Sequence, residues 1–341
     1  MAPSSQPSNS TKAVGMEQQR LQPPFSPEAA SSVPSLTSNV LHTLPTISRT
    51  PTHDAFLTET DIDTYLHRDL DLSRLNRIHK YLWMAGRPMN ARPLHRQRMM
   101  GRDILPTEQS DLHLLKFSSR LLVKPLPAYL LNYNFWTEHL CDSKALHESA
   151  CGLLVSYIWL ICSPLDMKIA HENNLLPSDL DWAWWKSFVD DVFNHININA
   201  LDAVNKRYHF GELRLGRINS IYRIRFFFSH FIRGYLYGYN RYHVFFERNF
   251  GWILVIFVYF SLVLSAMQVA TGVPGLKDNL EFLNASYGFV VFSIVLVAFF
   301  LGLVGVIFSS IFLYNMVAAI QDERQKRLRR EKLAREHKVD T

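Results

Sequence analysis

The chain has 341 residues, a formal net charge of +6 at pH 7 and 48% hydrophobic residues. Its three cysteines, Cys141, Cys151 and Cys162, are too few and too unevenly spaced for a disulfide framework or a paired-cysteine zinc motif, so we expect reduced thiols and no bound metal or cofactor. Much of the positive charge flanks long apolar runs, which favours an anionic membrane face as the partner over nucleic acid.

Residues 1–55 are rich in Ser, Pro and Thr and contain almost no aromatic side chains. Such a segment cannot bury enough apolar surface to offset the entropy of ordering the chain, so we predict a disordered tail. It lacks the apolar region of a signal peptide, and its prolines disfavour an amphipathic presequence helix. Membrane insertion is therefore expected to depend on internal segments.

Residues 57–215 are predicted to form a helical cytosolic domain. Apolar residues follow helical spacing over Leu72–Ala85, and Gly86 marks the end of that helix. The best strand signal, over Leu112–Val123, is weak. The uncharged run Ser149–Leu165 is short for a membrane span, so a buried core helix or a re-entrant segment is favoured over a third span.

Residues 216–250 interleave aromatic side chains with arginines and contain one acid, Glu247. Aromatic rings favour the water–lipid boundary, and arginine pairs with phosphate oxygens. We therefore predict an interfacial helix that leads into the membrane. The same residue types can bind single-stranded nucleic acid, but a neighbouring span makes that the weaker interpretation.

Two runs near the C-terminus, Asn249–Leu276 and Phe282–Gln321, contain no Asp, Glu, Lys or Arg. A bilayer-spanning helix needs about 20 apolar residues, so both runs are long enough. They predict a transmembrane hairpin. Its segments are a first span at 251–273, a connecting loop at 274–286, a second span at 287–314 and a basic tail at 315–341.

Basic residues set the predicted orientation of the hairpin. Seven of them lie between Arg324 and Arg335, and arginines also precede the first span, whereas the connecting loop holds only Lys277. Because cytoplasmic flanks carry an excess of Lys and Arg, both termini should be cytosolic and the loop lumenal. We expect an endomembrane location. The endoplasmic reticulum is one option, since Arg327–Arg330 is compatible with an arginine-type retrieval signal.

The sequence contains no nucleophile elbow, P-loop, zinc-protease or dinucleotide-binding motif, so it assigns no catalytic residue. The densest cationic part of the cytosolic domain has no acid and is a candidate site for an anionic headgroup, because guanidinium groups bind phosphates. Its arginines are Arg87, Arg92, Arg96, Arg98 and Arg102. The alternative is ion pairing within the domain, with Asp61, Asp63, Asp69 or Asp71.

The predicted spans carry no ionisable side chain other than tyrosine, which argues against an ion-coupled transporter. Small residues in the second span, Ala298, Gly302, Gly305 and Ser309, follow one another at intervals of four, three and four. They therefore share one helix face. Such a face allows two helices to approach closely, so it predicts packing within the hairpin or a homo-oligomer.

Five stretches of the sequence are distinctive: Trp83–Pro88, Arg92–Arg96, Trp159–Pro164, Val204–Asn219 and Leu264–Gln268. Together they resemble a family of fungal integral membrane proteins with no assigned function, over residues 57–320. The resemblance implies membrane placement and a filamentous-fungal source. It implies no catalytic residue.

The sequence thus predicts a mainly α protein, with a helical cytosolic domain followed by a two-helix transmembrane hairpin. The function that it favours is binding or scaffolding at a membrane surface, with anionic lipids as partners, and not catalysis. The alternative is an oligomeric channel or transporter built from several hairpins. A lipid-modifying enzyme that uses the Arg87–Arg102 segment is a weaker third hypothesis.

Overall fold

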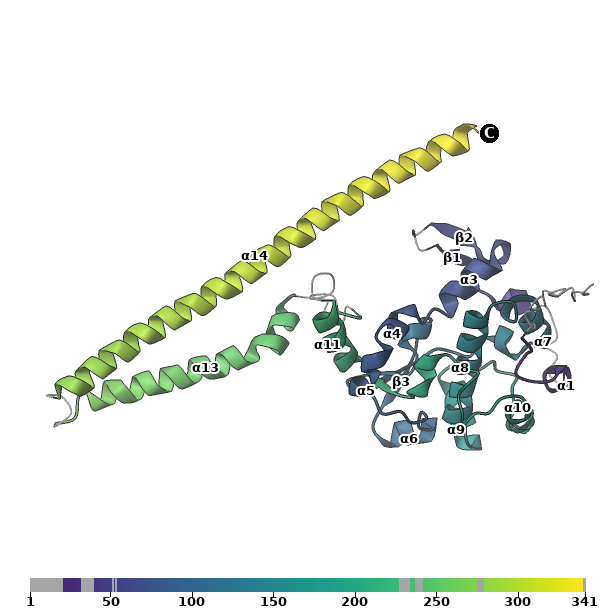
Figure 1. Cartoon of the computed structure of the whole chain (residues 1–341), viewed down its shortest axis with the longest axis horizontal. Helices are drawn as coiled ribbons and strands as arrows, with labels where there is room; N and C mark the ends of the chain where they lie inside the picture. Colours follow the sequence, from purple (N-terminus) through teal and green to yellow (C-terminus); the bar gives the residue numbers. More distant parts are fainter. Residues whose placement is uncertain are drawn as a thin grey trace, which may run out of the picture. The chain divides into compact units, whose positions relative to one another are not determined.

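The computed structural model describes residues 21–31, 40–50, 52, 54–226, 234–236, 242–274 and 279–339. The chain divides into two compact units, unit 1 (Met1–Tyr237) and unit 2 (Gly238–Thr341), which we describe separately (Figure 1). It is mostly helical, which confirms the predicted class. Unit 1 also contains two small β-sheets that the predicted helical domain lacked.

The helices of unit 1 are short, apart from α8, α10 and α11. Those before the four-stranded sheet are α1 (Pro27–Ser31), η1 (Val40–Thr43), η2 (Thr58–Thr60), α3 (Ile62–Asp69), α4 (Ser73–Arg77), η3 (His79–Tyr81), α5 (Leu82–Ala85) and α6 (Leu94–Met99). The later ones are η4 (Ser110–Leu112), η5 (Ala128–Leu131), α7 (Tyr133–Phe135), η6 (Trp136–Leu140), α8 (Lys144–Leu160), α9 (Pro164–Glu172), α10 (Trp182–His195), η7 (Lys206–His209) and α11 (Leu215–Arg225).

The predicted helix over Leu72–Ala85 is divided into α4, η3 and α5, and it ends at Gly86 as predicted. A glycine is required there because another part of the main chain passes close by. A Cβ on Gly86 would lie 2.5 Å from the carbonyl oxygen of Glu212.

Helix α8 lies in the hydrophobic core of unit 1, with 14 of its 17 residues buried. From Ser149 to Leu160 it carries no charged residue on any side, as expected for a helix that is covered all round. Pro164 begins α9 at an angle of 116° to α8, and Ser163 caps α9 by accepting a hydrogen bond from the backbone N–H of Asp166. The structure therefore agrees with the core-helix interpretation of Ser149–Leu165.

The larger sheet has the strand order β3-β5-β4-β6. Its strands are β3 (Asp103–Pro106), β4 (Leu115–Phe117), β5 (Arg120–Val123) and β6 (Leu213–Arg214). β4 and β5 form an antiparallel hairpin in which Lys116 faces Leu121, whereas β3 pairs with β5, and β6 with β4, in parallel. The predicted strand over Leu112–Val123 is therefore a hairpin, which turns at Ser118 with a φ of 55°.

Part of the predicted disordered tail is folded onto unit 1. Phe25 is 1% exposed and packs against the rings of Trp136 and Phe188. Further along, β1 (Ile47–Arg49) pairs antiparallel with β2 (Ala55–Leu57). The prediction of disorder over 1–55 does not hold for these residues. The ring of Phe25 is buried against other aromatic rings, and β1 and β2 pair with each other through their backbones. Residues 1–20 and 32–39 lie outside the described ones.

Helix α11 corrects the predicted interfacial segment 216–250. Ile218, Ile221 and Tyr222 are buried against the second hydrophobic cluster of unit 1, together with Leu82 of α5. Tyr235 is also buried, and its hydroxyl donates to a carboxylate oxygen of Asp111 at 2.9 Å. This part of the segment therefore belongs to the folded unit. Residues 227–233 and 237–241 lie outside the described ones.

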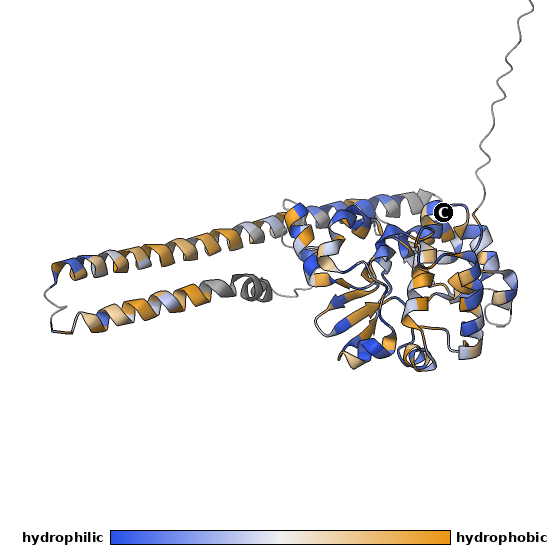
Figure 2. Ribbon diagram, turned by 60° about the horizontal axis from the view of Figure 1, so that its bottom comes forward, coloured by the Kyte–Doolittle hydropathy of each residue, from blue (hydrophilic) through white to orange (hydrophobic). Residues whose placement is uncertain are grey.

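Unit 2 consists of α13 (Tyr242–Ala270) and α14 (Leu280–Val339). The two helices contact each other near the connecting loop, where the rings of Phe260 and Phe289 stack with centroids 5.6 Å apart. Apolar residues predominate over Leu254–Ala270 of α13 and over the first part of α14, and polar ones follow toward the end of α14 (Figure 2).

One described helix of the chain is long and apolar enough to cross a membrane, the Leu280–Tyr314 part of α14. Its 35 residues extend over about 52 Å at 1.5 Å per residue, more than the hydrocarbon thickness of about 30 Å. The apolar part of α13, Leu254–Ala270, is shorter than a full span. The two-span hairpin therefore stays a prediction.

Candidate functional site

The arginine-rich segment Arg87–Arg102 contains α6. Two of its arginines lie close to the carboxylate of Glu212, a residue distant in the sequence. Guanidinium nitrogens of Arg102 and Arg92 lie 2.8 Å and 3.5 Å from Oε2 of Glu212. Lys116 on β4 adds a third cation, 3.1 Å from the same oxygen. Glu212 thus ties α6 to the four-stranded sheet.

Glu212 is a nearly buried anion, with its side chain 7% exposed. Its Oε1 accepts a hydrogen bond from Nε2 of Gln97 at 2.8 Å. Burial alone raises the pKa of Glu212, but the hydrogen bonds from Gln97 and Arg102 and the charge of Lys116 outweigh it and lower the pKa to about 2. The carboxylate is therefore ionised at any physiological pH.

A second set of contacts ties α6 to α9. Arg98 lies 2.7 Å from a carboxylate oxygen of Glu172. Asp166, whose side chain is fully buried, accepts hydrogen bonds from the backbone N–H of His95 at 2.7 Å and from the Ser163 hydroxyl at 2.7 Å. Nδ1 of His95 lies 2.8 Å from the same carboxylate.

Three of the five predicted headgroup-binding arginines are therefore engaged in ion pairs within unit 1. Their partners are Glu212 and Glu172, and none of the four aspartates predicted as alternatives. Among the described residues, Arg87 and Arg96 have no acidic partner. Headgroup binding by this segment stays a prediction for these two side chains.

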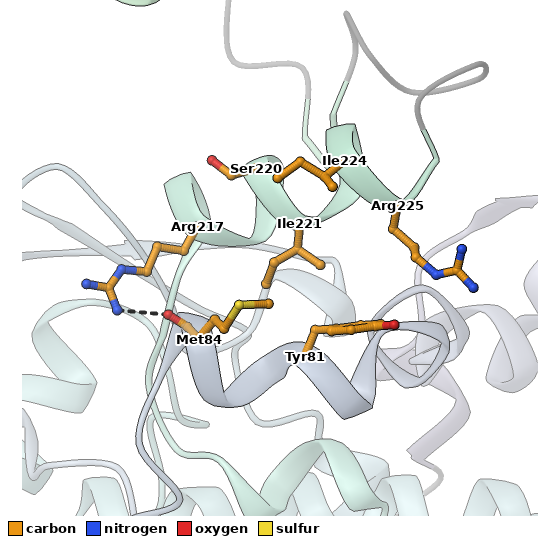
Figure 3. Close-up of a pocket in the computed structure, with 7 residues that line it drawn as sticks. All are labelled: Tyr81, Met84, Arg217, Ser220, Ile221, Ile224 and Arg225. Atoms are coloured by element: carbon orange, nitrogen blue, oxygen red, sulfur yellow. Dashed lines mark hydrogen bonds between the residues drawn. The ribbon is translucent and has the colours of Figure 1, made fainter.

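A groove between α5 and α11 has a volume of about 440 Å³, within the range of small-molecule sites. Figure 3 shows Arg217 and Arg225 at its two ends, with apolar side chains between them. The residues that line it are Tyr81, Met84, Arg217, Ser220, Ile221, Ile224 and Arg225. They include two cations and no acid, so the groove combines an apolar surface with positive charge.

Helical spacing explains why α11 presents this groove. Positions 217, 221 and 225 are four residues apart, and positions 220 and 224 lie three residues after 217 and 221, so all five lie on one side of a helix. Ile221 reaches the core and is 7% exposed, whereas Ile224 is 80% exposed. A guanidinium nitrogen of Arg217 donates to the carbonyl oxygen of Met84 at 2.8 Å, which fixes that end of the groove (Figure 3).

One buried pair in unit 1, His113 and Ser156, places an imidazole beside a hydroxyl in the core. Nε2 of His113 lies 2.8 Å from the Ser156 hydroxyl, but both side chains are buried, and Nδ1 of His113 accepts from the backbone N–H of Lys124. Burial and the nearby charges of Arg207 and Lys124 hold the pKa of His113 well below its usual value. Within the described residues there is also no cluster of three or more side chains suited to a metal ion.

The residues of the predicted small-residue face of α14 have different surroundings in the structure. Ala298 lines a cavity of about 380 Å³ between α13 and α14. A Cβ placed on Gly302 or Gly305 would meet no atom within 4 Å. These two glycines thus do not pack against α13, and their use in self-association stays a prediction.

Replacing Gly302 or Gly305 with Leu should weaken self-association of the full chain at least tenfold, the effect of about 1.4 kcal/mol. The added side chain would separate two helix backbones that meet at this face. The measurement is crosslinking of the full chain in a mild detergent. Gly288→Leu is the matched control, because Gly288 lies on α14 ten residues before Ala298, beyond the four small residues, and also has open space around it. Parent-like crosslinking of all three variants would contradict the prediction.

Sequence reasoning identified the arginines of the Arg87–Arg102 segment but missed Glu212, the common partner of Arg92 and Arg102. Glu212 follows Arg102 by 110 residues, so no spacing rule connects the two. The groove was missed because α11 was assigned to the membrane interface. The available signal was the recurrence of Ile218, Ile221 and Tyr222 at helical spacing, which is typical of a helix packed on a core.

Comparison with curated proteins and comparison with solved structures each returned no match. A family model does match, over residues 62–297, from the start of α3 into α14. Its description assigns no function, and it names neither a source nor a membrane. The match covers more than two thirds of the chain, including the arginine-rich segment and the groove. The chain therefore belongs to the family described as "Family of unknown function (DUF6601)".

Proposed function

We propose that the protein is anchored in a membrane by unit 2 and acts as a binding or scaffolding protein at an anionic membrane surface. The observation that supports this proposal is the composition of α14. Its first 35 residues are mostly apolar and mostly exposed, with Glu281 as their one charged residue, and the same helix then continues to Val339 with many basic side chains. An exposed apolar helix of this length needs a lipid or protein environment.

The proposal includes the orientation predicted from the flanking charges. Both termini face the cytosol, the connecting loop faces the lumen of an endomembrane, and unit 1 lies on the cytosolic side. From Asn315 to Val339, α14 extends for about 37 Å at 1.5 Å per residue, so it carries its basic groups well beyond the apolar part.

The basic end of α14 should bind vesicles that contain an acidic lipid. Each basic side chain near an anionic leaflet is worth about 1 kcal/mol. Changing Arg324, Arg330 and Arg335 to Gln should therefore weaken binding about a hundredfold, equivalent to about 3 kcal/mol. The measurement is co-flotation of the full chain, held in nanodiscs of neutral lipid, with vesicles containing phosphatidylserine.

The matched control changes the same three arginines to Lys, which keeps the charge and should keep most of the binding. High salt should release the parent protein from the vesicles, because it screens exposed charges. Equal co-flotation with neutral and acidic vesicles would show that the basic end of α14 has no role in surface binding, and the proposal would fail.

A further inference from the structure

We propose that the α5–α11 groove binds one anionic phospholipid, with the phosphate at the Arg225 end and an acyl chain along Met84, Ile221 and Ile224. This inference deepens the proposed function, and it rests on it for the nearness of a membrane. The groove has the volume of a small-molecule site, and its lining is apolar apart from a few polar groups.

The two ends of the groove differ in their capacity to bind an anion. Arg217 already donates to the carbonyl oxygen of Met84, at 2.8 Å. Arg225 has no acidic partner among the described residues, and the hydroxyl of Tyr81 lies on the same side of the groove (Figure 3). A guanidinium group and a hydroxyl at one end match the donors that a phosphate requires. The phosphate is therefore assigned to the Arg225 end.

The apolar part of the groove requires a ligand with more than a charged head. Ile224 is 80% exposed and Tyr81 is 36% exposed, so two large side chains at the rim face solvent. An acyl chain laid over them and over Met84 would remove apolar surface from water, which a free phosphate or a sugar phosphate cannot do. The combined chemistry is that of a lipid with a negatively charged head.

The connection to unit 2 supports a membrane as the source of this lipid. Residues 226–241 join the end of α11 to the start of α13 in one continuous chain. α13 leads into the apolar segment Leu254–Ala270. The groove is thus tethered to the segment that is proposed to enter the bilayer, which raises the local concentration of lipid around it.

The test uses the full chain in an uncharged detergent, freed of bound lipid, and titrated with short-chain phosphatidylserine below its micelle concentration. Binding is followed by native mass spectrometry. Phosphatidylserine should bind at least about tenfold more tightly than diacylglycerol of the same chain length, which has no phosphate and therefore cannot accept the charge-assisted hydrogen bond from Arg225. Glycerophosphoserine, which has the head without acyl chains, should bind at least about tenfold more weakly.

Variants locate the site. Arg225→Gln should weaken phosphatidylserine binding about tenfold and leave diacylglycerol binding unchanged. Tyr81→Phe should weaken it about threefold to tenfold, through loss of one hydrogen bond. Arg120→Gln is the matched control, since Arg120 is exposed on β5, away from the groove lining, and should bind like the parent.

Three results would overturn the inference. Equal affinity for glycerophosphoserine would make this a site for a free anion, and equal affinity for diacylglycerol would remove the role of Arg225. An equal loss in Arg225→Gln and Arg120→Gln would show that binding is a general charge effect. The Arg324, Arg330 and Arg335 variant should keep parent affinity in this titration, so failure of the groove and failure of the basic helix end are separate outcomes.

Discussion

Glu212→Gln should destabilise unit 1 by about 3 kcal/mol at pH 7. A pKa lowered from 4.5 to about 2 corresponds to about this free energy, because each pKa unit is worth 1.36 kcal/mol. The neutral amide would leave Arg102, Lys116 and Arg92 facing one another without a counter-charge. The measurement is thermal unfolding of the full chain in detergent, followed by tryptophan fluorescence. The midpoint should fall by about 6–12 °C for a unit of this size.

The effect of Glu212→Gln should vary with pH in one direction. The folded-state pKa of Glu212 is depressed, so its contribution is complete above pH 4.5 and is lost as pH falls toward 2. Parent and variant should therefore differ fully at pH 7 and approach each other at pH 3. A difference between the two proteins that stays constant from pH 7 to pH 3 would contradict this account.

Glu172→Gln is the matched control for Glu212→Gln. Glu172 pairs with Arg98 at 2.7 Å, but both side chains are more than 40% exposed. Exposed ion pairs contribute about 0–1 kcal/mol, so this variant should unfold close to the parent. If it matched Glu212→Gln, burial would not be the reason that Glu212 matters.

Gly152→Ala should destabilise unit 1 by about 3 kcal/mol, through overpacking in the core. Gly152 lies within α8, and a Cβ there would overlap the ring of Tyr208, which is 2% exposed. The ring has no free space to move into, so α8 and η7 would have to separate. Chemical unfolding of the full chain in detergent measures the loss.

Tyr208→Leu supplies the control for this prediction, because it removes the ring that the new methyl group would strike. Adding Gly152→Ala to Tyr208→Leu should cost less than about 1 kcal/mol, so the two substitutions should not be additive. Additive losses would show that Gly152→Ala acts through something other than the Tyr208 ring.

The arginine-rich segment shows what a local pattern can predict about a site. A run with five arginines and no acid needs anionic partners from outside the run. Both hypotheses, binding of a lipid headgroup and ion pairing within the domain, followed from that need alone. The choice between them depends on which carboxylates arrive from elsewhere in the chain. The pairing of β6 with β4 brings Glu212 next to the arginine-rich segment, and the packing of α9 on α6 brings Glu172 there. Neither can be read from the segment itself.

The sequence by itself determined the properties that depend on composition and local spacing. These are the mostly helical class, the end of α5 at Gly86, and the long apolar helix of unit 2. The uncharged run in α8 favoured a core helix or a re-entrant segment, because a helix without a polar face is covered on all sides, and the structure shows the core helix.

Only the tertiary structure decided the properties that depend on contacts between distant residues. Phe25 is part of the core, and the predicted Leu112–Val123 strand is a hairpin. Helix α11 packs on α5, and the two form the groove. The physical reason is that short strands and single aromatic anchors have little intrinsic preference. Their free energy comes from burial against partners that the local sequence does not contain.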